Sequence, residues 1–357
     1  MWDLAVREDD YKAVDAMLAR YAGAPLSYRI VPAYARADTA QVNRLRDEAR
    51  ALDARQSQIA ARYLATYLTN VTAADEIARF DLQPRRNAGI QLGAQSFLAW
   101  LEVARGRWSS AKQAFDEAER MEGGTAIRQE RALAATLPFL EVPRSDVEAA
   151  RHDIDSWNAA PPAGNASLTT ALRPHYRLYL LGLLSSRLGE SDRAEAYVRD
   201  LERLSVPPSA TNVVTGLAAT IRADVAMSRG HAADALKLLS AADGAVPLEL
   251  VYTKPFASVR EYTQEHARYL RAEALLATGR NDEARHWFQY SFQGSPLELA
   301  YLAPMHSRLG QLAERAGSPA DAVTHLRAFL KLWEQCDATL QPQVVDAAAR
   351  VRRLQTQ

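Results

Sequence analysis

Histidine and carboxylate side chains spaced one helical turn apart can hold a metal ion, and this 357-residue chain lacks that pattern. His266 and His286 lie too far apart to share one helix turn, and no His-Glu-x-x-His sequence occurs. A Gly-x-Ser-x-Gly nucleophile turn and a glycine-rich phosphate loop are also missing from the sequence. We therefore predict no metal, no cofactor and no catalytic residue, which indicates a protein that is not an enzyme.

The acidic pair Asp9–Asp10 and the single cysteine, Cys336, have simple structural interpretations. The two carboxylates precede an apolar-periodic stretch, where such side chains cap a helix and suit its dipole. One cysteine cannot form an intramolecular disulfide, and a lone cysteine is most often a small core residue. We assign no chemistry to these residues.

Composition limits the classes of partner. Lysine plus arginine and aspartate plus glutamate number 43 each, so the formal net charge is zero, whereas a nucleic-acid-binding protein usually has a basic excess. The sequence has no basic N-terminal region followed by an apolar run and no uninterrupted apolar stretch of about 20 residues. We predict no nucleic-acid partner, no membrane insertion and a cytoplasmic location.

The elements that would position any site are helices. Good helix formers dominate, apolar residues recur at spacings of three and four residues, and proline or glycine separates the periodic segments. Alternating strand patterns are nearly absent. The sequence therefore predicts an all-α protein.

One spacing pattern recurs along the chain: a glycine, an alanine five residues later and a large apolar residue four residues after that. The interval between successive copies is about 40 to 50 residues or twice that. The glycines are Gly106, Gly189, Gly230, Gly279 and Gly317. A glycine can end the first helix of a hairpin in a left-handed turn, and an alanine lets the two helices cross closely. We expect Ala194, Ala284 and Ala322 to be buried at such crossings. A degenerate unit with helices near residues 126–139 and 146–157 fills the longest gap.

The pattern resembles the tetratricopeptide repeat (TPR), in which the first helix also carries a small residue where it packs on its partner helix, as in Leu181-Gly182 and Leu309-Gly310. The resemblance implies an α-solenoid of stacked antiparallel helical hairpins, a TPR-like superhelix, over residues 1–357. Residues 1–89 would hold degenerate helical repeats, 90–335 recognisable repeats and 336–357 a C-terminal capping helix. The inward face of that helix would carry Val344, Ala348, Val351 and Leu354. The period exceeds the family's usual length, so the curvature need not be the standard one.

The order of the units resembles the repeat tail of some bacterial serine/threonine kinases, for example in "LYLLGLLSSRLGESDRAEAYV". This resemblance implies a bacterial regulatory protein, with a covalently linked kinase or regulator domain upstream as one arrangement. The chain would then begin inside a repeat; a short first unit is the alternative.

First helices line the concave groove in the TPR family, so the resemblance places certain side chains there. We predict that Trp100, Tyr176, Tyr179, His266 and Tyr269 bind the partner, with Ser307 and Gln311 also facing the groove. The alternative is that the aromatic rings pack against the neighbouring hairpin and expose only their polar tips. The lysine that other family members use to bind a terminal carboxylate is missing from the equivalent positions.

These observations favour a non-catalytic scaffold or sensing module that binds a protein or peptide segment in the concave groove. Two alternatives stay open: a module that binds a small effector, and an all-helical enzyme without a recognisable motif. A linear groove that crosses several repeats would favour a peptide, whereas a closed pocket with converging polar groups would favour a ligand or an enzyme.

Overall fold

The computed structural model describes residues 2–21, 23–51, 54–121, 124–160, 167–240, 247, 250, 265–290 and 296–356. Within these ranges every regular element is an α-helix or a short 3₁₀ helix, so the prediction of an all-α protein is confirmed.

The first part of the chain forms short helices. These are α1 (Trp2–Arg7), α2 (Tyr11–Ala19), α3 (Leu26–Ala35), α4 (Thr39–Ala51), α5 (Ala54–Leu68) and α6 (Val71–Arg79), followed by the 3₁₀ helix η1 (Phe80–Leu82). The Asp10 side chain accepts a hydrogen bond from the Ala13 amide and caps α2, as the acidic pair predicted.

Longer helices follow, mostly in consecutive pairs. They are α7 (Ala88–Ala104), α8 (Trp108–Glu119), α9 (Ile127–Thr136), α10 (Arg144–Asp155), α11 (Leu168–Ala171), α12 (Arg173–Arg187), α13 (Ser191–Arg203), α14 (Thr211–Ser228), α15 (Ala232–Ser240), α17 (Glu265–Ala277), α18 (Asn281–Tyr290), α19 (Leu302–Arg315), α20 (Pro319–Leu332) and α21 (Gln341–Gln355). The connecting 3₁₀ helices are η2 (Gly124–Ala126), η3 (Pro208–Ala210), η5 (Pro296–Tyr301) and η6 (Ala338–Leu340).

The repeated glycines and alanines take the positions that the spacing predicted. All five glycines have a positive φ, between 68° and 79°, and each ends the first helix of a packed pair. The five alanines that follow them are fully buried: Ala111, Ala194, Ala235, Ala284 and Ala322. The degenerate unit is also present, because α9 packs on α10.

The small residues on the first helices have two different neighbours. A Cβ on Gly310 would lie 2.7 Å from Leu326 of α20, the second helix of the same pair. A Cβ on Gly182 would lie 2.6 Å from Ile221 of α14, which belongs to the next pair. Gly182 therefore permits close packing between units rather than within one, which differs from the expectation.

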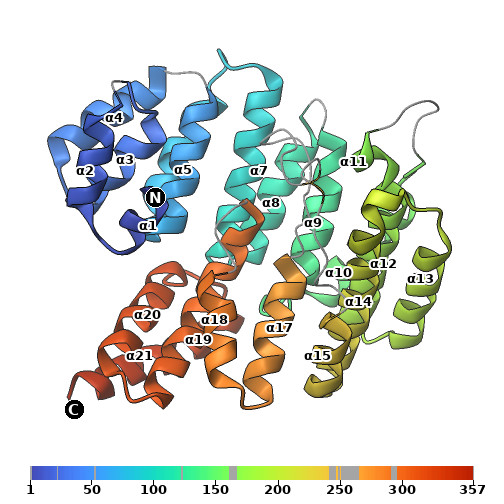
Figure 1. The fold of residues 1–357 in the computed structure, drawn as a ribbon. Coiled ribbons are helices and arrows are strands. Elements are labelled where there is room, and N and C mark those ends of the chain that lie inside the picture. The colour runs from blue at the N-terminus through green and yellow to red at the C-terminus, as the bar shows by residue number, and fades with distance from the viewer. Residues whose placement is uncertain are drawn as a thin grey trace.

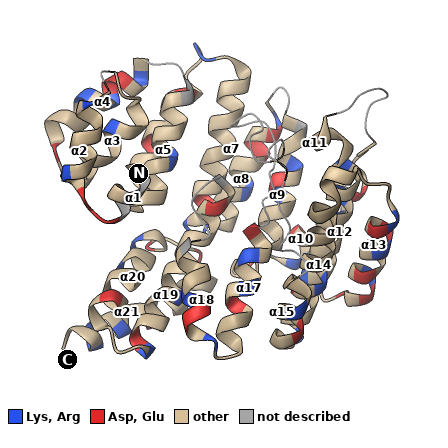
Figure 2. Ribbon diagram, viewed as in Figure 1, with Lys and Arg blue, Asp and Glu red and all other residues tan. Residues whose placement is uncertain are grey.

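The chain doubles back on itself. In Figure 1 the helices run from α2 across to α13 and then return through α14, α17 and α19 to α21, which lies beneath the first helices. Hydrogen bonds and ion pairs join neighbouring helices along the way, as between Arg308 of α19 and Glu273 of α17. Figure 2 shows basic and acidic residues interspersed along these helices.

A set of contacts that we call the seam joins residues 104–108 to residues 333–340. The Asp337 amide donates to the Gly106 carbonyl oxygen at 3.0 Å, and the Trp108 amide donates to the Asp337 carboxylate at 2.7 Å. The Trp333 indole donates to the Ala104 carbonyl oxygen at 3.2 Å. A Cβ on Gly106 would lie within 3.1 Å of Trp333, Cys336 and Leu340, whereas it would have open space at the other four repeat glycines.

The C-terminal helix packs its apolar stripe on the last pair. Ala347 and Val351 are buried, and Val344 and Leu354 pack partly buried against the core. Ala348, predicted on the same face, is only half-buried, so the centre of the contact lies at Ala347.

The packing predicts the result of enlarging one crossing residue. Ala284→Leu should lower the free energy of unfolding by about 1–3 kcal/mol, because α17 and α18 leave no room for a larger side chain. Ala320→Leu on the exposed face of α20 is the matched control and should change it by less than about 0.5 kcal/mol. Urea denaturation measures both, and equal stability of Ala284→Leu and wild type would contradict the packing argument.

Candidate functional site

Two adjoining cavities lie on the inner side of the helices that return from α14 to α21. Together we call them the hollow. Their volumes are about 450 Å³ and about 380 Å³. Four residues line both cavities and therefore mark their junction: Phe139, Tyr269, Arg308 and Gln343.

The larger cavity crosses the inner helices of several units. Its walls come from the α9–α10 turn (Thr136, Pro138, Phe139), α12 (Ser186, Arg187), α14 (Asp224, Met227, Ser228), α17 (Tyr269, Leu270, Glu273) and α19 (Arg308), with Gln343 of α21. First helices of successive pairs thus face it, as expected for the concave side.

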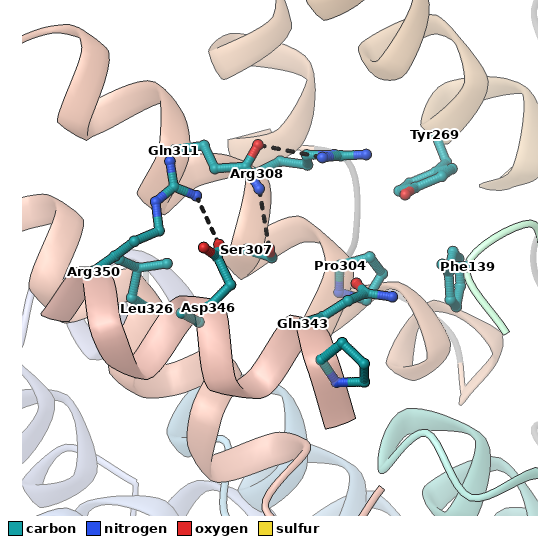
Figure 3. Close-up of a pocket in the computed structure, with 12 residues that line it drawn as sticks. Phe139, Tyr269, Pro304, Ser307, Arg308, Gln311, Leu326, Gln343, Asp346 and Arg350 are labelled. Carbon is teal, nitrogen blue, oxygen red and sulfur yellow. Dashed lines mark hydrogen bonds and ion pairs between the residues drawn. The ribbon is translucent and has the colours of Figure 1, made fainter. Parts of the chain in front are cut away.

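The smaller cavity lies between α19 and the C-terminal helix (Figure 3). Its α21 wall consists of Pro342, Gln343, Asp346, Ala347 and Arg350, and opposite it stand Pro304, Ser307, Arg308 and Gln311 of α19. The helix that covers the end of the array is therefore also a wall of the hollow.

The structure places the five predicted partner-binding side chains in the interior. Their exposed fractions are 0–3%: Trp100, Tyr176, Tyr179, His266 and Tyr269. Only Tyr269 lines the hollow, together with Ser307 and Gln311, the two other predicted groove residues. In this conformation the other four offer no surface to a partner, and their role in binding stays a prediction that requires them to be uncovered.

Closure of the path contributes to the burial of Tyr269. The Phe139 ring, on the α9–α10 turn, meets the Tyr269 ring with centroids 5.3 Å apart and the Tyr301 ring at 5.4 Å. Side chains from units far apart in sequence thus touch across the inner side. An open superhelix would leave these rings in contact with water.

The buried tryptophan and tyrosines pack as core residues. The Trp100 indole donates a hydrogen bond of 2.9 Å to the Glu130 carboxylate, which also accepts from Ser96. Burial raises the pKa of Glu130, and these two hydrogen bonds offset part of the rise. The Tyr176 and Tyr179 rings lie next to each other, with centroids 6.1 Å apart.

His266 belongs to a hydrogen-bonded chain that reaches the larger cavity. Its Nε2 lies 3.0 Å from Asp224 Oδ1, and its Nδ1 lies 3.5 Å from the Tyr301 hydroxyl. Ser186 donates to Asp224 Oδ2 at 2.5 Å. Because the serine bonds the carboxylate and not the imidazole, the arrangement is not that of a hydrolase triad.

Arg308 is fixed at the junction of the two cavities. Its Nε donates to Glu273 at 2.7 Å, and its Nη1 donates to the Gln311 amide oxygen at 3.2 Å. Burial and then the Glu273 carboxylate raise the pKa of Tyr269 well above its usual value, so the phenol stays neutral. Figure 3 shows the Arg308 guanidinium and the Tyr269 hydroxyl turned toward each other.

The fold brings two histidines together that are far apart in sequence. His306 Nδ1 lies 3.1 Å from His325 Nδ1 between α19 and α20. Burial lowers the pKa of His306 to about 3, with a further contribution from His325, and burial also lowers the pKa of His325. Among the described residues, no three His, Cys, Asp or Glu side chains converge to hold a metal ion.

Sequence reasoning missed Phe139, Arg308 and Gln343, although they form the junction of the hollow. Phe139 lies in a turn between Pro138 and Pro143, a stretch that carries no repeat signal. Gln343 is on the helix that was expected only to cover the end. The family offsets identify residues on first helices, and they cannot identify turns or a terminal helix that folds back.

Neither a protein-family model nor a curated protein matches this sequence. In the described part of the chain, none of the helices combines the length and the apolar character needed to cross a bilayer.

The burial of the predicted aromatic residues has a measurable consequence. Tyr179→Ala should lower the free energy of unfolding by about 3–5 kcal/mol, because it removes a fully buried ring and leaves a cavity. Tyr21→Ala removes a ring that is 70% exposed and should change it by less than about 0.5 kcal/mol. If chemical denaturation gave the same value for both variants, Tyr179 would not be a core residue.

Proposed function

We propose that this chain is a non-catalytic, TPR-like α-solenoid that binds an uninterrupted segment of a partner protein in the hollow. The recurrent glycine turns and buried alanines support stacked helical hairpins as the underlying architecture. The resemblance of the repeats to the tails of bacterial kinases adds that the binding serves a regulatory protein.

The observation that carries the proposal is the extent of the hollow. It is lined by α12, α14, α17, α19 and α21, which belong to successive units of the chain. A site spread over many helices suits a long ligand that makes many weak contacts, whereas a small molecule needs a few converging groups. Phe139 and Met227 add apolar surface to the polar groups of these walls, which suits a segment with side chains of mixed character.

Peptides selected against the full-length protein from a random display library provide the test. We expect selected peptides to bind wild type and to lose at least tenfold in affinity for Ser307→Trp, because an indole at Ser307 fills the smaller cavity. Ser109→Trp places the same ring on the exposed surface of α8 and is the control. Fluorescence anisotropy measures affinity, and thermal unfolding followed by circular dichroism verifies that both variants fold.

Two results would contradict the proposal. One is the failure of any peptide to bind the hollow. The other is a small molecule that copurifies with the protein, is detected by native mass spectrometry and is displaced by Ser307→Trp but not by Ser109→Trp. That second result would favour the effector-binding alternative.

A further inference from the structure

The ionised side chains that line the hollow are equal in number and opposite in sign. The cations are Arg187, Arg308 and Arg350, and the anions are Asp224, Glu273 and Asp346. The hollow as a whole therefore carries no net charge to attract a charged segment.

Each of these groups is already engaged by the protein. Arg308 pairs with Glu273 at 2.7 Å, and Arg350 lies 3.7 Å from Asp346 while it also binds Glu314. The Arg187 guanidinium donates to the carbonyl oxygens of the 138–140 turn, and the Asp224 carboxylate accepts from Ser186 and lies within hydrogen-bonding distance of the His266 ring. A charged partner side chain would therefore have to displace an existing contact of one of these groups before it could pair with it.

One polar side chain at the junction has no such engagement. Gln343 is exposed on α21, and its amide makes no hydrogen bond to any described part of the chain. Its side chain extends from α21 toward Phe139 (Figure 3). A glutamine amide offers one acceptor and two donors, the same complement as a peptide group, so it can bond both the N–H and the C=O of an extended chain.

The dimensions also suit an extended segment. The hollow passes from α14 across α17 and α19 to α21. Three steps between neighbouring helices, at about 10 Å each, span about 30 Å, which is the length of about nine extended residues. Gln343 stands where the two cavities adjoin, at the α21 end of that path, because it lines both of them.

We infer that the hollow takes a segment of about nine residues without charged side chains, and that Gln343 determines its register by pairing with one main-chain amide of the segment. This inference rests on the proposed function. It adds the chemistry of the bound segment and names the residue that determines its register. The charged groups of the walls already have partners and so disfavour acidic and basic segments, and the Gln343 amide selects for extended main chain.

The experiment uses the peptides selected above, in their free synthetic form, with the full-length protein. Gln343→Leu keeps helix propensity and side-chain size but removes both hydrogen-bonding groups, and it should weaken binding about tenfold. Gln355→Leu makes the same change on the exposed end of α21 and should leave affinity unchanged. Affinity should vary by less than about twofold between 50 mM and 300 mM salt, because no partner charge is involved.

An N-methyl scan of the peptide identifies the main-chain contact. Methylation of one main-chain nitrogen of the peptide should cost about tenfold against wild type and should add little against Gln343→Leu, because both changes remove the same contact. Methylation at neighbouring residues on the other face of the segment should cost less.

The outcomes separate this inference from the proposed function. If no peptide binds the hollow, the proposed function fails first. In another case, peptides bind wild type and lose affinity for Ser307→Trp, so the proposed function stands. The inference is then overturned if the selected peptides share charged residues, bind strongly only at low salt, or bind Gln343→Leu as tightly as wild type.

Discussion

The contact between the α7–α8 turn and the segment after α20 fixes the path of the whole chain. Arg107 stands at the N-cap of α8 and cannot accept a hydrogen bond, so Asp337 supplies the acceptor from far along the sequence. Gly106 permits this approach, because its missing side chain leaves the space that Trp333 and Leu340 fill. The segment after α20 is thereby tied to the turn between α7 and α8.

The hollow and the buried inner rings follow from that closure. The Phe139 and Tyr269 rings meet across the inner side, and both of these residues line the two cavities. Because α21 both covers the end of the core and forms a wall of the hollow, stability and binding depend on the same helix.

The packing within each helix pair was predictable from the sequence, but the angle between successive pairs was not. The glycine-to-alanine spacing identified Ala194 and Ala284 as crossing residues, because the requirement for a left-handed turn and a small side chain arises within one helix pair. The angle between successive pairs depends on many interfaces at once, and Gly182 shows one of them packing on the next unit. Small differences in angle accumulate, so they decide whether Tyr176 faces water or the interior.

Closure of the seam is the central claim, and the one cysteine of the chain reports on it directly. Cys336 is buried against Gly106, and burial raises the pKa of its thiol, which also slows its reaction. We predict that native protein is alkylated at least about a hundredfold more slowly than urea-unfolded protein at the same pH, because the closed seam covers the thiol. Alkylation of folded wild-type protein within a few-fold of the unfolded rate would mean that the seam is open and would contradict the account.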